Sequence, residues 1–164
     1  MRLALILLTA LLPLTTACSK KGGGACKALS VTIDGKAIPG LGHGLARVNK
    51  MHDERNWEVD LFNHDKVTCE QFNSKSGRPV AEGEVSVRAF AGGEGMMGAG
   101  VGIDSHTQSG VTVNLTGDKP KAVGDKVTIC VDNASFKPMV GANKDKTVVI
   151  DGLFEGSYCG EMAF

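Results

Sequence analysis

The chain has 164 residues, and its 18 Lys plus Arg balance its 18 Asp plus Glu, so the formal net charge is zero. A balanced charge gives no broad positive field of the kind that attracts nucleic acids, and we expect no nucleic-acid partner. Apolar residues make up 42% of the chain, which excludes a wholly disordered protein. No apolar run reaches the roughly 18 residues that a membrane helix needs, so a multi-spanning membrane protein is excluded as well.

The first 17 residues have the layout of a secretory signal peptide. Met1-Arg2 gives a short positive start, residues 3–12 are apolar apart from Thr9, and Pro13 ends this run. Small residues then lead directly to Cys18. We therefore expect residues 1–17 to be removed, and they are left out of the fold prediction.

The residues around the expected cleavage point read Leu14-Thr15-Thr16-Ala17-Cys18. This box resembles the signal of bacterial lipoproteins. The resemblance implies cleavage before Cys18 and attachment of lipid, including palmitate, to that cysteine. The lipid would then attach the protein to a membrane. In that family an aspartate after the lipidated cysteine often retains the protein in the inner membrane, so Ser19 implies the outer membrane of the cell envelope.

The alternative is an ordinary signal peptide that is cut after Ala17 and leaves Cys18 unmodified. The chain has five cysteines, and an odd number leaves one reactive thiol in an oxidising compartment. Lipidation of Cys18 leaves four cysteines, which favours the lipoprotein interpretation. The chain then divides into a signal peptide (residues 1–17), a lipidated cysteine with a glycine-rich tether (residues 18–25) and a single domain (residues 26–164).

Short alternating apolar and polar runs, separated by Gly, Asp, Asn and Pro, predict β-strands in this domain. No helical pattern persists for three turns. The expected strands are residues 29–33, 56–62, 84–89, 111–115, 127–131, 148–150 and 153–164, with weaker signals at residues 43–49 and 99–105. Turns are expected at Asp34-Gly35, at residues 63–65 and at Asp151-Gly152. The pattern predicts an all-β fold, an antiparallel β-sandwich or small β-barrel of about eight to ten strands, with Trp57 buried on a central strand.

The four remaining cysteines, Cys26, Cys69, Cys130 and Cys159, are far apart in the sequence. Zinc sites usually draw on close pairs of cysteines, so two disulfides are the better interpretation. Three pairings are possible. The position of Cys159 in the last strand and of Cys69 just after a turn favours the pairs 69–159 and 26–130. The alternative is that one pair stays reduced and buried.

Residues 93–98 match the glycine pattern GxGxxG of dinucleotide-binding folds. That pattern functions only where a helix follows directly, and the glycine-rich residues after it do not predict one. We interpret residues 92–102 as a glycine-rich loop. Met96 and Met97 in this loop have flexible side chains that suit adaptable contacts, so they are candidates for a contact surface.

His52 and the pair His64-Asp65 flank the strand that contains Trp57. If the chain folds back there, these side chains could bind zinc or copper. Nothing in their spacing requires a metal, and polar residues beside turns are the simpler explanation. We expect no cofactor.

No nucleophile, base and acid occur in a recognised arrangement, so we lean against an enzyme. The first hypothesis is a lipid-anchored envelope protein whose β domain is a non-enzymatic binding or structural module for an unknown protein, glycan or small ligand. The alternatives are a metal-binding or metal-sensing domain that uses His52 and His64, and a hydrolase whose catalytic residues the sequence does not locate.

Overall fold

The computed structural model describes residues 26–51, 54–75, 77–92, 99–104 and 106–163. Its strands form a single ten-stranded sheet, which confirms the all-β prediction. In chain order the elements are β1 (Ser30–Ile33), β2 (Lys36–Ala37), β3 (His43–Met51), β4 (Glu54–Phe62), α1 (Cys69–Phe72), β5 (Ser86–Ala91), β6 (Ala99–Ile103), β7 (His106–Ser109), β8 (Thr112–Thr116), β9 (Lys126–Phe136) and β10 (Val148–Ala163).

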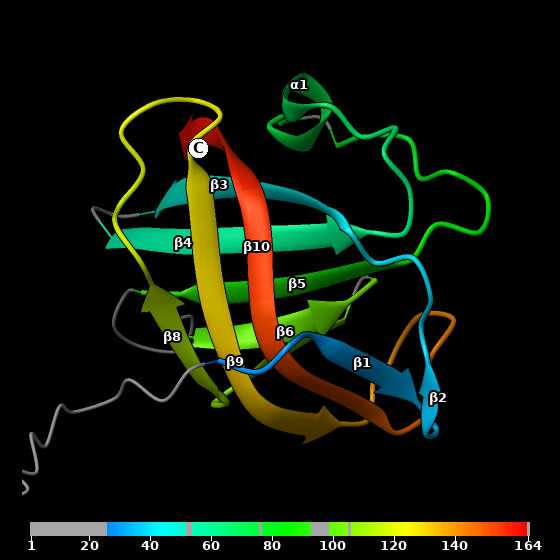
Figure 1. Ribbon diagram of the computed structural model, residues 1–164. Helices are drawn as coiled ribbons and strands as arrows, with labels where there is room; N and C mark the ends of the chain where they lie inside the picture. The colour runs from blue at the N-terminus through cyan, green and yellow to red at the C-terminus, as the bar shows by residue number, and fades with distance from the viewer. Residues whose placement is uncertain (1–25, 52–53, 76, 93–98, 105, 164) are drawn as a thin grey trace, which may run out of the picture.

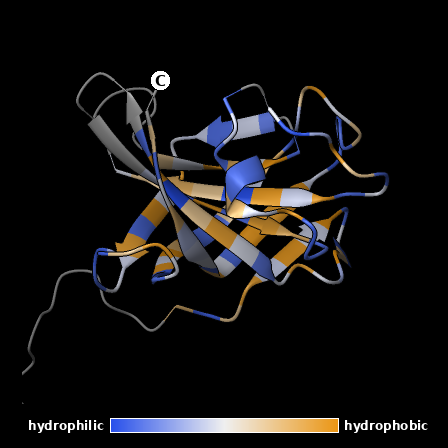
Figure 2. Cartoon of the chain, turned by 90° about the horizontal axis from the view of Figure 1, so that it is seen from above, coloured by the Kyte–Doolittle hydropathy of each residue, from blue (hydrophilic) through white to orange (hydrophobic). Residues whose placement is uncertain are grey.

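The sheet bends into two layers that cross each other. β8, β9 and β10 form a front layer, and β3, β4, β5 and β6 run across behind them (Figure 1). Orange and blue or white bands alternate along the strands in Figure 2, because one face of each strand packs into the core and the other faces outwards. The core between the layers is mostly aliphatic, with Val59 and Ile129 fully buried at its centre. Trp57 is buried in this core on β4, a strand that is paired on both sides, with β3 and with β5, as predicted.

β10 joins the two layers. One of its edges pairs with β9, and the other pairs first with β1 and then with β3. The β3–β10 pair is parallel, whereas the other strand pairs of the described residues are antiparallel. The expectation of a purely antiparallel fold was therefore wrong at this pair, because β10 crosses into the rear layer alongside β3 instead of turning back on a neighbour.

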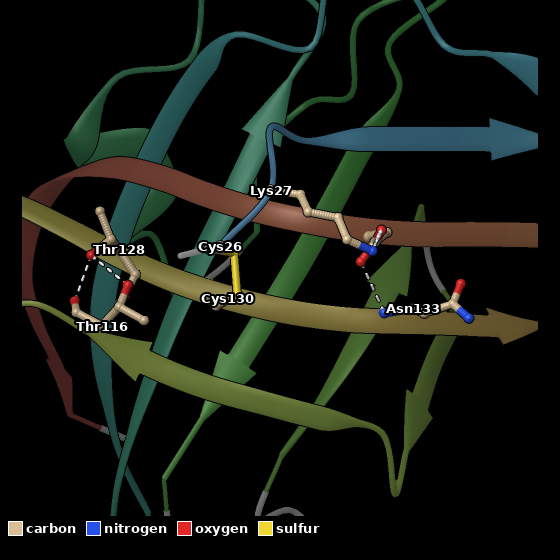
Figure 3. Close-up of a disulfide and its surroundings, with 7 residues drawn as sticks. Cys26, Lys27, Thr116, Thr128, Cys130 and Asn133 are labelled. Atoms are coloured by element: carbon tan, nitrogen blue, oxygen red, sulfur yellow. Dashed lines mark hydrogen bonds and ion pairs between the residues drawn. A yellow bond between two sulfur atoms is a disulfide. The ribbon is translucent and has the colours of Figure 1, made fainter. Parts of the chain in front are cut away.

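The turn expected at Asp151-Gly152 is absent, and β10 runs through these residues without reversing. The register with β9 shifts here, and Asn133 takes up the extra residue of β9 with φ of 42°. The backbone N–H of Asn133 donates to Oδ1 of Asp151 at 3.1 Å, as Figure 3 shows. The Asp-Gly pair thus lies beside a β-bulge, which bends a strand without ending it.

Two glycines allow β3 and β10 to approach each other closely. A Cβ atom on Gly44 would lie 1.8 Å from the carbonyl oxygen of Glu155, and one on Gly156 would lie 2.9 Å from the backbone of Leu45. Only glycine fits where two backbones are this close. The crossing of the two layers therefore depends on these residues.

The turn predicted at Asp34-Gly35 is present, with φ of 48° and 76° at the two residues. Residues 99–103 form β6, which confirms the weaker strand signal at residues 99–105 and shows that the glycine-rich loop expected at residues 92–102 was drawn too long. Gly100 faces Phe90 on β5, and the ring of Phe90 covers the space that a side chain at residue 100 would fill. The glycines of this segment therefore make room for a neighbouring ring, which the sequence alone does not reveal.

Both disulfides are present with the favoured pairing, Cys26–Cys130 and Cys69–Cys159. Figure 3 shows the first bridge on the outer face of β9. The second fixes α1 to β10. No helix among the described residues is long and apolar enough to cross a membrane.

α1 is a single turn that begins with a capping box. The Thr68 hydroxyl accepts the Gln71 N–H, and the Gln71 side chain accepts the Thr68 N–H. Its Phe72 packs against Leu45 and Phe62 on the outer face of β3 and β4. The segment from residue 63 to residue 85, which contains α1, therefore covers part of the outer face of the rear layer.

Candidate functional site

Four charged side chains lie on the outer face of the rear layer, on three adjacent strands. Arg47 on β3 is paired in register with Glu58 on β4, and Asp60 on β4 is paired with Arg88 on β5. They alternate with core residues such as Val59, so their face is the one opposite the core. Cross-strand neighbours on one face lie close enough for their side chains to meet.

The four charges compensate one another. Arg47 donates to Glu58 at 2.6 Å, and Arg88 holds both carboxylate oxygens of Asp60 at 2.8 Å through Nε and Nη2. Arg88 Nε also lies 3.3 Å from Glu58, which accepts a further hydrogen bond from Asn49 at 2.5 Å. Two positive and two negative charges thus form one connected network.

Glu58 and Asp60 are the most enclosed members, with 6% and 5% of their side chains exposed. The electrostatic effect on Glu58 follows from this burial. Burial raises the pKa of its carboxyl group, and the neighbouring charge of Asp60 raises it further, while Arg88 and Arg47 oppose this rise. The pKa rises because the loss of water around the carboxylate outweighs the favourable charges of its two arginine neighbours.

Arg47 also fixes the covering segment to the sheet. It donates to the backbone carbonyl of Phe72 at 2.6 Å, and its guanidinium lies 4.4 Å from the centre of the Phe72 ring. A third contact joins it to the sulfur of Met162 on β10 at 3.5 Å. The Arg47 side chain therefore links β3, β4, α1 and β10, and its contacts hold these elements together.

A second cluster, formed by Arg78, Glu84 and His64, holds the C-terminal part of the covering segment (residues 63–85) against the sheet. Arg78 binds both oxygens of Glu84, and His64 lies 3.0 Å from the same carboxylate. The Arg78 guanidinium stacks over the Phe62 ring at 4.8 Å. The hydrogen bond from Arg78 is the largest effect that lowers the pKa of Glu84, and the N–H of Ala81 and the His64 ring add to it.

Between these clusters lies an open groove of about 1050 Å³. Its floor includes Asp60 and Arg88 from the rear layer, and one wall is the covering segment. The opposite wall is built from the β1–β2 region, Asp104 and the loop of residues 141–146. Asn143 steadies this loop, because its side chain donates to Asp104 at 2.8 Å. We call this feature the outer groove.

The outer groove combines apolar and cationic side chains. Its apolar members are Ile33, Ile38, Phe72, Val80, Val85 and Met162. Its cationic members are Arg47, Lys75, Arg78, Arg88 and Lys146, against the acids Asp60, Glu84 and Asp104. Each of these carboxylates accepts a hydrogen bond from a side chain of the protein.

Of the candidate residues from the sequence, the structure brings together only the cysteine pairs. His64 bonds to Glu84, and Asp65 is exposed beside it. No three His, Cys, Asp or Glu side chains of the described residues are placed to hold a metal ion. Cys18, His52, Met96 and Met97 lie outside the described residues.

The groove and its charged floor were not predicted from the sequence. Glu58 and Asp60 look like the solvent side of an alternating strand, yet both are 4% exposed. One signal was present, because Leu45 and Phe62 share their outer face and are apolar. Apolar residues on both faces of a strand indicate that something covers the second face.

No protein-family model, curated protein or solved structure matches this chain.

Proposed function

We propose that this chain is a lipid-anchored protein of the bacterial outer membrane, and that its β domain binds a ligand in the outer groove without catalysing a reaction. The observation that carries the binding role is the groove itself. It is a concave, mostly apolar site with a few polar groups at fixed positions, which is the usual form of a binding site.

The state of the charged groups supports binding over catalysis. A general acid or base needs a group that can give or accept a proton within reach of the substrate. Asp60 is engaged on both oxygens by Arg88, and Glu58 is engaged by Arg47 and Asn49. These carboxylates hold the floor of the groove in shape, which suits a preformed binding surface.

The lipid anchor is supported by the signal-like first 17 residues and by the cysteine count. Two disulfides pair the other four cysteines with one another: Cys26 with Cys130, and Cys69 with Cys159. None of these four is therefore a disulfide partner for Cys18. The intact mass of protein extracted from native membranes, alkylated without reduction, tests this part. We expect an acyl-sized increment on Cys18 and no alkylation. An unlipidated mass with an alkylated thiol would contradict the anchor.

The binding role is tested by a photoreactive amino acid at Ala142, an exposed residue that lines the groove. The matched control is the same substitution at Ala28, which is exposed and lies outside the groove lining. In cells that carry the protein naturally, we expect irradiation to give a defined adduct from residue 142 only. No adduct from residue 142, or the same adduct from both positions, would argue against a ligand in the groove.

A further inference from the structure

The outer groove offers an occupant apolar walls and unpaired positive charge together. Ile33 and Ile38 line one wall, and the exposed Val80 lines the other. Lys75 and Lys146 stand on opposite walls, and neither forms an ion pair with a carboxylate of the described residues. The groove thus has a positive group on each side of an apolar channel.

Arg88 adds a third positive group in the floor. Its Nε and Nη2 atoms bind Asp60, whereas Nη1 has no hydrogen-bond partner within the described parts of the chain. The side chain is 39% exposed, so the protein covers the guanidinium only in part. A guanidinium that is already fixed by one carboxylate is well placed to donate to a second.

Several ligand classes fit this combination poorly. A lipid acyl chain would remove water from the Arg88–Asp60 pair and offer no hydrogen bond in return, which is costly. A glycan usually needs an exposed aromatic face, and the aromatic residue of the lining, Phe72, is buried. The volume of about 1050 Å³ lies just above the range for small-molecule pockets, which reaches about 1,000 Å³.

We infer that the outer groove binds an extended acidic peptide segment of a partner protein. Its carboxylates face Arg88, Lys75 and Lys146, and its apolar side chains contact the walls. Because the groove is open, the peptide backbone keeps its contact with water and needs no strand partner. The inference rests on the proposed function, since it names the ligand class of the same site.

The test is a selection of random heptapeptides displayed on phage against the full chain in detergent. We expect enriched peptides to combine Asp or Glu with apolar residues. A fluorescent synthetic copy of the most enriched peptide should bind about tenfold more weakly to the Lys75→Glu/Lys146→Glu variant. Its affinity should also fall as ionic strength rises. Lys119→Glu, an equally exposed charge reversal outside the groove lining, is the matched control and should bind like the wild type.

Two results would overturn the inference: no enrichment of acidic peptides, or an affinity that the double charge reversal leaves unchanged. The photoreactive residue at Ala142 separates this failure from failure of the proposed function. An adduct of residue 142 with a glycan or lipid would keep the binding role and reject the peptide. Absence of any adduct there, together with no enrichment, would reject both.

Discussion

At the scale of single residues, Glu58 illustrates how a buried charge depends on its partners. Its carboxylate accepts hydrogen bonds from Arg47 and Asn49 and lies close to Arg88. Removing one member of such a network leaves the others buried without compensation, and that is where the cost arises.

We expect Glu58→Ala to lower the free energy of unfolding by about 3–5 kcal/mol, because Arg47 and Arg88 would lose a buried partner. Urea unfolding followed by the fluorescence of Trp57 measures this loss. The control is Glu155→Ala, since the pair of Glu155 with Lys126 is largely exposed and should contribute less than about 1 kcal/mol. Equal losses in the two variants would contradict the importance of burial.

Glu84 gives a pH dependence whose sign follows from its pKa. The Arg78 hydrogen bond lowers this pKa below its ordinary value of 4.5 in the folded protein. The stabilisation is therefore complete above the unfolded-state pKa and is lost as pH falls through the lower folded-state pKa. Glu58 acts in the opposite sense, because its pKa is raised in the folded protein. Its contribution to stability is complete below the unfolded-state pKa and is lost as pH rises through the folded-state pKa.

We expect the wild-type urea midpoint to fall between about pH 5 and pH 3, and Glu84→Gln to show a shallower fall over the same range. Unfolding curves at several pH values measure the difference. Glu82→Gln, an exposed change in the same segment, should keep the wild-type slope. An unchanged slope in Glu84→Gln would contradict the role of the Arg78 contact.

At the scale of secondary-structure elements, the crossing of β3 and β10 depends on Gly44, because glycine has no Cβ atom. We expect Gly44→Ala to cost more than about 4 kcal/mol, because its Cβ would meet a backbone carbonyl that cannot move without breaking the strand. Thermal unfolding followed by circular dichroism measures the loss. Gly42→Ala is a close control, since the nearest atom to its Cβ would be 3.9 Å away. A similar loss in both variants would show that the crossing is not the reason.

The two disulfides should act alike on global stability and differently on local order. Their sequence separations of 104 and 90 residues each correspond to about 4–5 kcal/mol in the chain-entropy model. Of the two bridges, Cys69–Cys159 is the one that joins the segment of residues 63–85 to the sheet. We expect faster hydrogen exchange of that segment in C69S/C159S and not in C26S/C130S, as measured by mass spectrometry. Equal exchange in the two variants would contradict this division.

The strands were largely predictable because alternation depends only on neighbours in the sequence. The runs around Trp57, Val87 and Ile129 all became strands at or near their expected positions. The failure at Asp151 has a different origin, since a turn and a bulge use the same residue types and tertiary pairing decides between them. The groove was not predictable, because no local pattern shows that residues 63–85 return to cover Glu58.

At the scale of the whole molecule, the outer groove and the first disulfide lie on opposite outer faces. Cys130 is on the outer face of β9, whereas Arg88 is on the outer face of β5, and the core lies between these layers. The seven residues between Cys18 and Cys26 span at most about 30 Å. In the lipid-anchored protein that we propose, the front layer is therefore nearer the membrane and the groove faces away from it.

This arrangement predicts different depths for two positions in vesicles that contain brominated lipids. A fluorescent amino acid at Asn114, which is exposed and paired with Cys130, should be quenched more strongly than one at Ala142. The stronger quenching is expected because residue 114 should lie closer to the bilayer than residue 142. Equal quenching at the two positions, or stronger quenching at residue 142, would contradict the orientation.

The Cys26–Cys130 bridge also sets the path of a mechanical load. Force applied to the chain before Cys26 enters the sheet through a covalent bond in the middle of β9, a strand that is hydrogen-bonded to β8 on one edge and β10 on the other. Without the bridge the same force would act on the hydrogen bond from Leu153 to Lys27 and then on the four residue pairs that join β1 to β10, which would separate one after another. In the lipid-anchored protein that we propose, the oxidised domain should therefore resist unfolding when a force acts on its N-terminus, and reduction of this bridge should lower that resistance.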